Sequence, residues 1–426
     1  MNPGALRTGA PAGSMPRSLV WLLSAAVFIN YFDRGNLATA APLMQAELQL
    51  SNAQMGVLFA AFFWSYAPLQ PFAGWLAQRF DVRFVLAGGL ALWAVATLLT
   101  GFAAGFTHLL ILRVLLGIGE SVFYPCNSRL LAQRAAPHER GRANGFIAVG
   151  QSLGPAVGTL AGGIALAAMG WRAMFIVFGA LSLLWLVPWR VATRGGLTGA
   201  RGTAAAPVGY RELLRQRALW GTSLGHFCGN YAFYFLLSWL PSFLVRDQGY
   251  SLRQMALLGA AVYLMQALSA PLTGLLCDRL IAGGAPANHV LKIAINTGVC
   301  VVALVMALCA FAHGTQVIAL LLIAGIFFGV QSAPLGAITQ TLAGPRAAGR
   351  WMGIQNFCAN LSGIIAPWSA GWLLDVTGGY AAAFLIAAAV TLLGVWAFGI
   401  LIRQVAPLPW SGAAAQADQR EAGMSM

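Results

Sequence analysis

The stretch LVWLLSAAVFINYFDRGNLATA, residues 19–40, decides the fold because it is apolar over the width of a membrane and yet carries two adjacent charges, Asp33 and Arg34. About 20 apolar residues in a helix cross the roughly 30 Å hydrocarbon core of a bilayer. The run has no small-residue cleavage site and continues into the charged segment NYFDRGN, which is not typical of a signal peptide. We interpret it as a retained first membrane span that follows a disordered cytoplasmic tail at 1–18.

The rest of the chain repeats this pattern. Of its 426 residues, 59% are hydrophobic and 8% are charged, whereas soluble domains carry roughly a quarter charged residues. Further apolar stretches, bounded by charged or Gly/Pro-rich breaks, predict spans at 55–77, 84–104, 108–131, 143–168, 172–190, 217–244, 254–280, 290–312, 315–339, 351–373 and 379–402. The sequence therefore predicts an all-α integral membrane protein with twelve transmembrane helices.

The chain is expected to divide into two pseudo-symmetric six-helix bundles. The longest polar break, 191–216, falls between the sixth and seventh predicted spans and is interpreted as a cytoplasmic linker. It separates an N-terminal bundle at 19–190 from a C-terminal bundle at 217–403, with a cytoplasmic tail at 404–426.

Repeated phrases support this division. GWLAQR (74–79) after the second span matches GLLCDR (274–279) after the eighth, and GWRAMF (170–175) matches GYAAAF (379–384). Duplicated carriers show such internal repeats. From the first pair of phrases we assign gating or packing roles to Gly74, Arg79, Asp278 and Arg279.

The net charge of +14 is explained by membrane topology. With a cytoplasmic N-terminus, nineteen of the 25 Lys and Arg residues fall on the cytoplasmic side and only Arg172, Arg246 and Arg253 on the other. The positive-inside rule demands such a split for a protein with both termini in the cytoplasm. No nucleic-acid partner is needed to explain the charge, and the lipid bilayer is the expected environment.

Four charged residues lie well inside predicted spans: Asp33, Arg34, Arg113 and Glu120. A charge at the centre of a membrane helix costs about 2.5–3.5 kcal/mol, so these residues must be paired or face water. Counted from the outer ends of the predicted spans, Asp33 and Arg113 lie at about 8–10 Å depth and Glu120 at about 18 Å. We expect Asp33 to pair with Arg113 and Arg34 to reach Glu120, with a direct pair of Glu120 and Arg113 as the rival arrangement.

Such a set can be purely structural or can mark a route for substrate and protons. Arginine is always charged, and its planar fork matches a carboxylate. Protonation of Glu120 or Asp33 would free an arginine for a substrate carboxylate. The residue types therefore suggest a proton-coupled anion site, with Asp33 and Glu120 as proton-coupling residues and Arg34 and Arg113 as substrate-binding residues.

Other polar residues in the spans could complete this site or could simply join helices to one another. The candidates for substrate binding are Tyr66, Gln151, Asn230, Tyr234, Asn356 and Asn360. His226 is interpreted as a helix-packing residue. The phrase GQSLGPAVG (150–158) places Gly154 and Pro155 in the fifth span and predicts close helix contact with a kink.

We expect no enzyme activity, metal or cofactor. The six cysteines stand singly in apolar runs without metal-ligand spacing, and the sequence contains no HExxH, GxSxG or phosphate-loop motif.

Taken together, these residues resemble the major facilitator superfamily, and within it the anion:cation symporter family of galactonate, glucarate, hexuronate and sialic acid carriers. The phrases that carry the resemblance are NYFDRGN (30–36), RVLLGIGE (113–120) with SVFYP (121–125), SWLP (238–241) and NFCAN (356–360). The resemblance implies proton-driven uptake of an organic anion, in which Asp33 and Glu120 titrate and Arg34 holds the carboxylate. Gln78 departs from the family's loop signature, which has an aspartate at that position, whereas Asp278 keeps it in the second half.

The function expected from residues and resemblance is therefore uptake of a small organic anion with protons, most simply a hydroxylated monocarboxylate such as a sugar acid. The expected setting is a bacterial inner membrane, and the expected state is a monomer. An exporter or exchanger of amphipathic compounds, and a sensor that binds the anion without moving it, are the alternatives.

Overall fold

The computed structural model describes residues 16–134, 137–194 and 208–410. The first half contains α1 (Arg17–Leu48), α2 (Asn52–Arg79), α3 (Val82–Thr100), α4 (Phe106–Ser121), α5 (Phe123–Arg134), α6 (Pro137–Leu184) and α7 (Leu186–Ala192). The second half contains α8 (Tyr210–Leu214), α9 (Arg217–Ser242), η1 (Phe243–Asp247), α10 (Leu252–Ala282), α11 (Ala287–Cys309), α12 (Thr315–Thr377), α13 (Ala381–Trp396) and η2 (Ala397–Leu401). The predicted all-α fold is confirmed.

Two of these helices contain two membrane spans each. Gly170 in α6 has φ 73° and Gly344 in α12 has φ 62°, a left-handed conformation that glycine adopts without steric cost. The helical direction changes at both positions, so α6 supplies the fifth and sixth spans and α12 the tenth and eleventh. Conversely, α4 and α5 follow each other through Val122 and together form the fourth span.

Within the described residues, eight segments are long and apolar enough to cross a membrane, and one of these, Val149–Ala192, includes the break at Gly170. The helices α1, α2 and α9 have 32, 28 and 26 residues and are long enough but more polar. With them, the described residues contain the twelve spans that the sequence predicts.

The first span differs from its prediction. It does not end near residue 40 but continues as a helix to Leu48, with Pro42 inside it. The polar residues Gln45 and Glu47 belong to this extra length, which sequence hydropathy assigned to a loop. This extension changes the depth of every residue counted from the outer end of α1.

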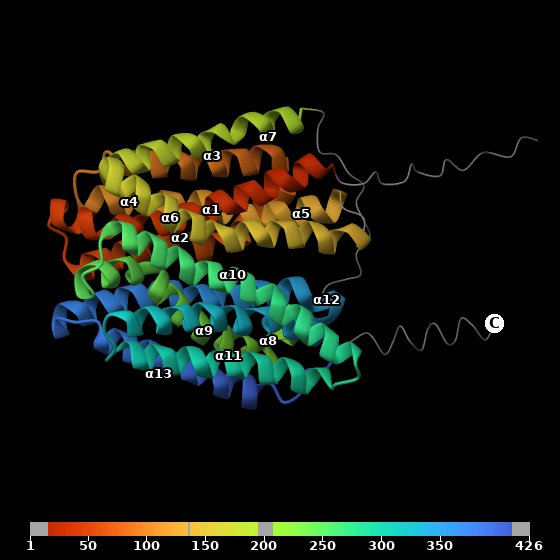
Figure 1. Cartoon of the computed structure of the whole chain (residues 1–426). Coiled ribbons are helices and arrows are strands. Elements are labelled where there is room, and N and C mark those ends of the chain that lie inside the picture. The colour runs from red at the N-terminus through yellow and green to blue at the C-terminus, as the bar shows by residue number, and fades with distance from the viewer. Residues whose placement is uncertain (1–15, 135–136, 195–207, 411–426) are drawn as a thin grey trace, which may run out of the picture.

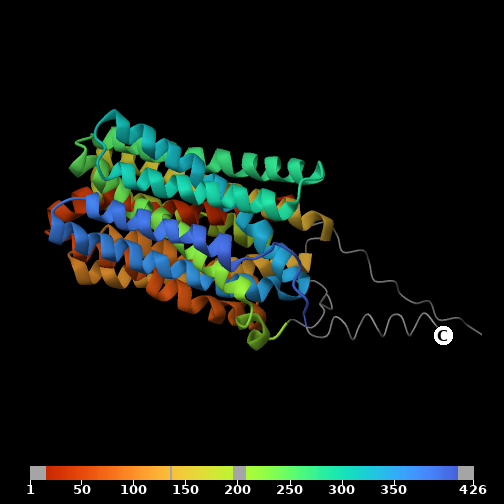
Figure 2. The same cartoon turned by 90° about the horizontal axis from the view of Figure 1, so that it is seen from below.

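The helices gather into two layers. In Figure 1 the helices of the first half (red to yellow) lie above those of the second half (green to blue), and Figure 2 shows the same arrangement from below. The layers meet mainly where α2 packs on α12 and α6 packs on α10. Glycines allow this close approach: a Cβ on Gly56 would lie 2.6 Å from the Pro367 oxygen, and one on Gly163 would lie 2.2 Å from the Ala256 side chain. The predicted linker 191–216 contains the short helix α8, and its residues 195–207 lie outside the described part of the chain.

The two halves are joined at one end of the molecule. The Asp375 carboxylate at the end of α12 accepts hydrogen bonds from the backbone N–H groups of Asn52 (3.2 Å) and Ala53 (2.7 Å) at the start of α2. Arg246 donates a hydrogen bond to the Pro42 carbonyl, 3.3 Å away. We call these three contacts the outer seal, after the side of the membrane that the sequence analysis expects this end to face.

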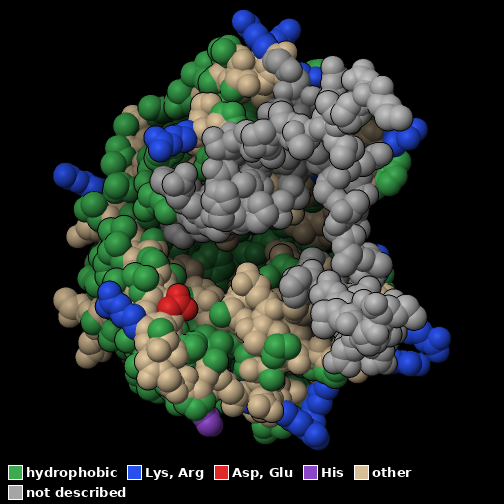
Figure 3. Space-filling view, turned by 90° about the vertical axis from the view of Figure 1, so that its right-hand side faces the viewer, with side chains coloured by type: hydrophobic (Ala, Val, Ile, Leu, Met, Phe, Trp, Pro, Cys, Tyr) green, Lys and Arg blue, Asp and Glu red, His purple; other side chains and the backbone are tan. Residues whose placement is uncertain are grey.

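The opposite end is hollowed. Viewed from the end of the molecule that carries the chain termini, the surface opens into a depression between the two layers, and Lys and Arg side chains stand at the outer edge of this face (Figure 3). The described structure is therefore closed at the outer seal and open on the other side.

Candidate functional site

An ion pair between α1 and α4 forms the centre of the candidate site. The Arg34 Nε atom lies 2.8 Å from Glu120 Oε2, and the two side chains are only 4% and 0% exposed. Arg34 lies fourteen residues before Leu48 and Glu120 fourteen residues after Phe106, so both are about 21 Å from the outer ends of their helices. The predicted pairing of Arg34 with Glu120 is confirmed.

Asp33 and Arg113 do not pair, which corrects the expectation for these two residues. The Asp33 carboxylate accepts hydrogen bonds from Asn36 Nδ2 (3.1 Å) and Ser182 Oγ (3.3 Å), and Arg113 Nε donates to the Leu58 carbonyl (3.3 Å). The only buried ion pair within the described residues is that of Arg34 and Glu120, so the rival pairing of Glu120 with Arg113 is also wrong here.

The extra length of α1 explains the difference. Asp33 lies fifteen residues from Leu48, about 22 Å deep, whereas Arg113 is seven residues from the start of α4, about 10 Å deep. The expectation placed both at the same depth. Both side chains nevertheless line a small cavity of about 10 Å³ together with Thr97 and Thr100 of α3, which is space for about one water molecule.

Aromatic rings enclose the Arg34 guanidinium. Its central carbon lies 4.6 Å from the ring centre of Tyr31, 4.9 Å from that of Phe62 and 4.5 Å from that of Tyr66. A cation over aromatic faces is stabilised by each ring, more so away from water. Arg34 Nη2 is buried and has no hydrogen-bond partner in the described structure. The Nε atom of the guanidinium is thus bound by Glu120, and the Nη2 atom is available for a further hydrogen bond.

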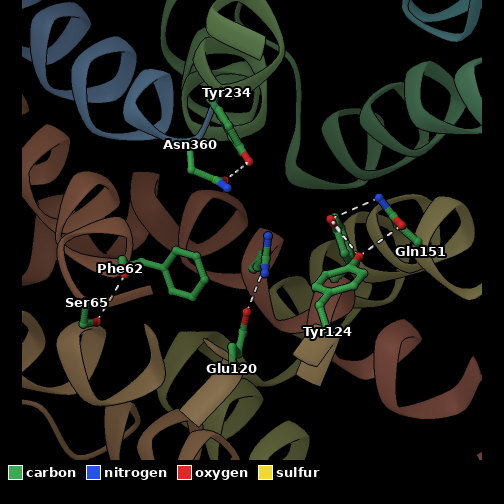
Figure 4. A network of polar contacts seen from close by, with 9 residues as sticks. Phe62, Ser65, Glu120, Tyr124, Gln151, Tyr234 and Asn360 are labelled. Atoms are coloured by element: carbon green, nitrogen blue, oxygen red, sulfur yellow. Dashed lines mark hydrogen bonds and ion pairs between the residues drawn. The ribbon is translucent and has the colours of Figure 1, made fainter. Parts of the chain in front are cut away.

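Three polar side chains form a triangle on one side of the ion pair. Tyr124 donates to Gln151 Oε1 at 3.1 Å, Gln151 Nε2 donates to the Tyr31 hydroxyl at 3.1 Å, and the hydroxyls of Tyr124 and Tyr31 lie 3.3 Å apart. Figure 4 shows Gln151 and Tyr124 together at one side of Glu120. Tyr31, Phe62 and Tyr124 were missed as site residues, although Tyr31 and Tyr124 stand inside two of the phrases that carry the resemblance.

The second half contributes a neutral pair. The Tyr234 hydroxyl donates to Asn360 Oδ1 at 3.0 Å, and Asn360 Nδ2 donates to the Asn356 carbonyl at 2.9 Å. In Figure 4 this pair lies across from Glu120. The structure brings Tyr234 and Asn360 to the site, but within the described residues it shows no hydrogen bond from the side chains of Asn230 or Asn356.

The remaining predicted residues lie away from the ion pair. A Cβ on Gly154 would lie 2.7 Å from Tyr31 Cβ, which places the region around Pro155 in α6 directly against α1. The backbone of α6 leaves helical geometry at Gly170, so the kink predicted at Pro155 stays a prediction. His226 contacts Gln355, with His226 Nδ1 3.3 Å from Gln355 Nε2, and its surroundings fit a packing role.

The residues of the repeated loop sequences GWLAQR (74–79) and GLLCDR (274–279) make few of the contacts expected for gating. Arg79 is exposed, a Cβ on Gly74 would meet open space, and the ion pairs of the described residues include none from Arg79, Asp278 or Arg279. The side chain of Gln78 lies outside the described part.

Beside Gln78, Asp81 makes the ion pair of this loop instead. Its carboxylate lies 2.7 Å from Arg83 Nη2 and also accepts from the Arg83 backbone N–H at the start of α3. The hydrogen bond from the Arg83 side chain lowers the pKa of Asp81 below its usual range.

Comparison with known proteins places this geometry in a family. The sequence profile of the Major Facilitator Superfamily matches residues 23–358 and 290–422. The probable sulfoacetate transporter of Cupriavidus necator is 32% identical over 395 residues, which cover 88% of this chain and 90% of that protein. The probable L-galactonate transporter of Escherichia coli is 29% identical, with 90% of this chain and 88% of that protein covered, and the hexuronate transporter of Bacillus subtilis is 27% identical, with 94% and 97% covered.

Among solved structures, a bacterial homolog of the human lysosomal transporter Spinster in an inward-facing and occupied conformation matches with a TM-score of 0.78. It is 21% identical, and the match covers 92% of this chain and 98% of that chain, so it supports the fold. These relatives are transporters and not enzymes. The chain, with its twelve spans and its buried ion pair, belongs to the Major Facilitator Superfamily of membrane transporters.

Proposed function

We propose that the protein is a proton-coupled symporter that takes up a small organic anion by alternating access, and that the anion is a hydroxylated monocarboxylate such as a sugar acid. The observation that carries this proposal is the buried pair of Arg34 and Glu120, in which one guanidinium nitrogen has no partner. The relatives support an organic anion, because they are named as transporters of galactonate, hexuronate and sulfoacetate.

Arg34 is the group that would hold the carboxylate. A guanidinium can form two parallel hydrogen bonds with a carboxylate, and its Nε and Nη2 atoms point along one edge of the fork. Tyr31, Phe62 and Tyr66 hold the guanidinium in place through their rings. The substrate would take the edge that Glu120 now half occupies.

Neutral groups would bind the rest of the substrate. Gln151 and Tyr124 lie on one side of the ion pair, and Tyr234 and Asn360 lie across from it. Amide and hydroxyl groups both donate and accept hydrogen bonds, which suits sugar hydroxyls. In the described residues of the second half, no cation is buried at this depth, and this favours a substrate with a single strongly held anionic end.

Glu120 would couple transport to protons. While Glu120 is ionised it competes with the substrate for Arg34, and once protonated it no longer attracts the guanidinium. Proton binding and substrate binding would then favour each other. Asp33 is a second carboxylate in the same bundle, fully enclosed but without a cation partner, and is proposed as a further proton-binding group.

The proposal also includes the orientation of the protein in the membrane and its oligomeric state. The protein would lie in the inner membrane of a bacterial cell. Both termini would face the cytoplasm, because most Lys and Arg residues fall in segments on the same side of the membrane as the termini. The outer seal would then face outward and the hollow in Figure 3 would face the cytoplasm. Transport would require the outer seal to open and the hollow to close, with a monomer as the working unit.

Transport by proteoliposomes tests the proposal. Wild-type protein should accumulate D-galactonate when the outside is acidic, and Glu120→Gln should still exchange the anion in counterflow but no longer accumulate it. Asp33→Asn removes the second proposed proton-binding carboxylate but leaves the Arg34 partner in place, so it should give a similar but separable defect in accumulation. Undiminished accumulation by Glu120→Gln would show that protons travel by another route.

A substrate screen separates the alternatives. Thermal stabilisation of the purified protein by sugar acids and sulfonates, but not by amphipathic cations, is expected for the proposed uptake system. An anion that stabilises the protein without being moved in counterflow would instead identify a sensor.

A further inference from the structure

The last described residues of the chain form an extended segment that packs on the second half. Residues 402–410 follow η2 and are not helical, and we call them the C-terminal strap. Most of the strap belongs to the tail predicted at 404–426. Val405 and Trp410 are nevertheless only 6% and 8% exposed. The strap is therefore part of the folded second half up to Trp410.

The end of the strap contacts the break between the two spans of α12. Gly344 has φ 62°, so the helix stops there and the carbonyl groups just before it have no helical donor one turn ahead. The Leu408 backbone N–H donates to the Leu342 carbonyl at 3.2 Å. Trp410 Nε1 donates to the Ala343 carbonyl at 2.8 Å. The strap thus supplies donors to the open end of the tenth span.

Trp410 also reaches the start of the eleventh span, on the other side of the break. Its ring meets the Trp351 ring edge-on, with 6.4 Å between the ring centres. Trp351 is fully buried, and its Nε1 donates to Thr222 Oγ1 of α9 at 3.0 Å. One side chain of the strap therefore contacts both spans that meet at Gly344, and Trp351 connects them to α9.

The beginning of the strap is fixed to α11. The Val405 backbone N–H donates to Asn288 Oδ1 at 2.8 Å. Lys292 Nζ donates to the carbonyls of Gly399 and Arg403 at 3.3 and 3.1 Å. These carbonyls lie at the C-terminal end of the last span, where a helix leaves carbonyl groups unpaired. All these partners belong to the second half, so the strap joins spans within one bundle.

The first half differs from the second at the matching position. GRWMG (349–353) at the start of the eleventh span corresponds to GRANG (141–145) at the start of the fifth. Ala143 therefore stands where the second half has Trp351. An alanine offers no ring for a tryptophan to pack on, so the sequence restricts this contact to the second half.

Gly344 is by itself a place where two helices can bend against each other. Glycine adopts many backbone conformations, and hinges absorb large changes in φ and ψ. A Cβ on Gly344 would meet nothing within 4 Å, so the packing around the glycine does not restrict it. The restriction has to come from contacts on both sides of the break, and the strap makes such contacts.

We propose that the C-terminal strap is a conformational device that holds the Gly344 break in one arrangement. The tenth and eleventh spans then move as one block with α9 and α11 when the hollow opens or closes. The movement takes place between the two halves and not by bending within the second. This device does not depend on the identity of the anion or on proton coupling.

Hydrogen–deuterium exchange of the purified protein, followed by mass spectrometry without substrate, tests the strap. In Trp410→Ala the backbone amides of 340–352 should exchange about 2- to 13-fold faster than in the wild type for the lost hydrogen bond, and faster still for the lost ring contact. A chain that ends after Arg403 should show the larger effect, because it also loses the Leu408 donor. A chain that ends after Trp410 keeps the strap and should exchange as the wild type does.

Two further variants separate the strap from general stability. Trp410→Phe keeps a ring and loses only the N–H donor, so it should show the smaller acceleration without endangering the fold. Trp189→Ala is the matched control, because Trp189 is 2% exposed and its Nε1 donates to the Arg83 carbonyl at 3.0 Å in the first half. Its exchange should rise in the first half and stay at the wild-type rate over 340–352.

The outcomes decide the proposal. Wild-type exchange over 340–352 in both Trp410→Ala and the chain that ends after Arg403 would overturn it. An equal acceleration there in Trp189→Ala would assign the effect to general loss of stability and would also overturn it. An equal acceleration in the chain that ends after Trp410 would assign the effect to residues beyond the strap, with the same consequence. Because no substrate is present, none of these outcomes bears on the proposed transport of an anion with protons.

Discussion

Replacement of Arg34 by lysine separates charge from fork geometry at the centre of the site. Lysine keeps one positive charge near Glu120 but cannot present Nε and Nη2 side by side. The variant should therefore lose one charge-assisted hydrogen bond to the anion, about 1.5–3 kcal/mol, which corresponds to roughly 10- to 150-fold weaker binding. Isothermal titration of the detergent-solubilised protein with the anion identified by the screen measures this change.

Arg34→Ala should abolish binding and also destabilise the protein. Glu120 is 0% exposed, and removal of one partner of a buried pair costs about 3–5 kcal/mol because the other charge is left uncompensated. The double variant Arg34→Ala with Glu120→Gln should regain part of the lost thermal stability without regaining binding. That recovery would show that the loss in the single variant comes from the stranded carboxylate.

Arg113→Lys is the matched control for the lysine substitution. Arg113 is buried to a similar extent and also lies over the Phe62 ring, but its Nε is bound to the Leu58 carbonyl. It should therefore bind the anion with nearly wild-type affinity. Near-wild-type affinity in Arg34→Lys together with weak binding in Arg113→Lys would refute the assignment and move the carboxylate to Arg113.

Three further predictions concern other parts of the molecule. A single cysteine introduced into 191–216 should react with a membrane-impermeant reagent only in permeabilised cells, and reaction in intact cells would overturn the proposed topology. Asp375→Ala should weaken the outer seal, so that a cysteine at the buried position Thr159, introduced as Thr159→Cys, reacts several-fold faster from outside; an unchanged rate would show that the carboxylate does not hold the halves together. Asp81 has a lowered pKa in the folded protein, so the stability that it adds is present above the ordinary aspartate pKa and is lost as the pH falls through the lowered value. Asp81→Ala should therefore reduce the melting temperature at neutral pH, through the lost cap of α3 and the lost contact with Arg83, and the difference from wild type should shrink in acid.

The helical pattern and one ion pair were predictable from the sequence because both depend on local spacing. Apolar runs of membrane length give the spans directly, and the strong cost of a lone buried charge requires partners for Arg34 and Glu120. Their equal depth of about 21 Å follows only from the full length of α1, which the sequence analysis did not predict. The breaks at Gly170 and Gly344 also fall between predicted spans.

The sequence predictions were wrong or incomplete where they depended on the depth of a residue in the membrane or on the rotation of one helix against its neighbour. Hydropathy ended the first span too early because Gln45 and Glu47 are polar, although they belong to a helix that extends beyond the apolar core. This shifted Asp33 relative to Arg113 and produced a pair that the structure does not contain. Spacing along one helix also says nothing about how its neighbour is rotated, so the rings of Tyr31 and Phe62 around Arg34 could not be placed.

The two sides of the outer seal differ in how many substitutions they tolerate. Asp375 contributes a side chain, whereas Asn52 and Ala53 contribute only peptide N–H groups. Most exchanges at Ala53 keep that donor, and proline is the residue that removes it. Many substitutions in the first turn of α2 would therefore keep the contact. A substitution of Asp375 on the opposite side removes the carboxylate and with it both hydrogen bonds.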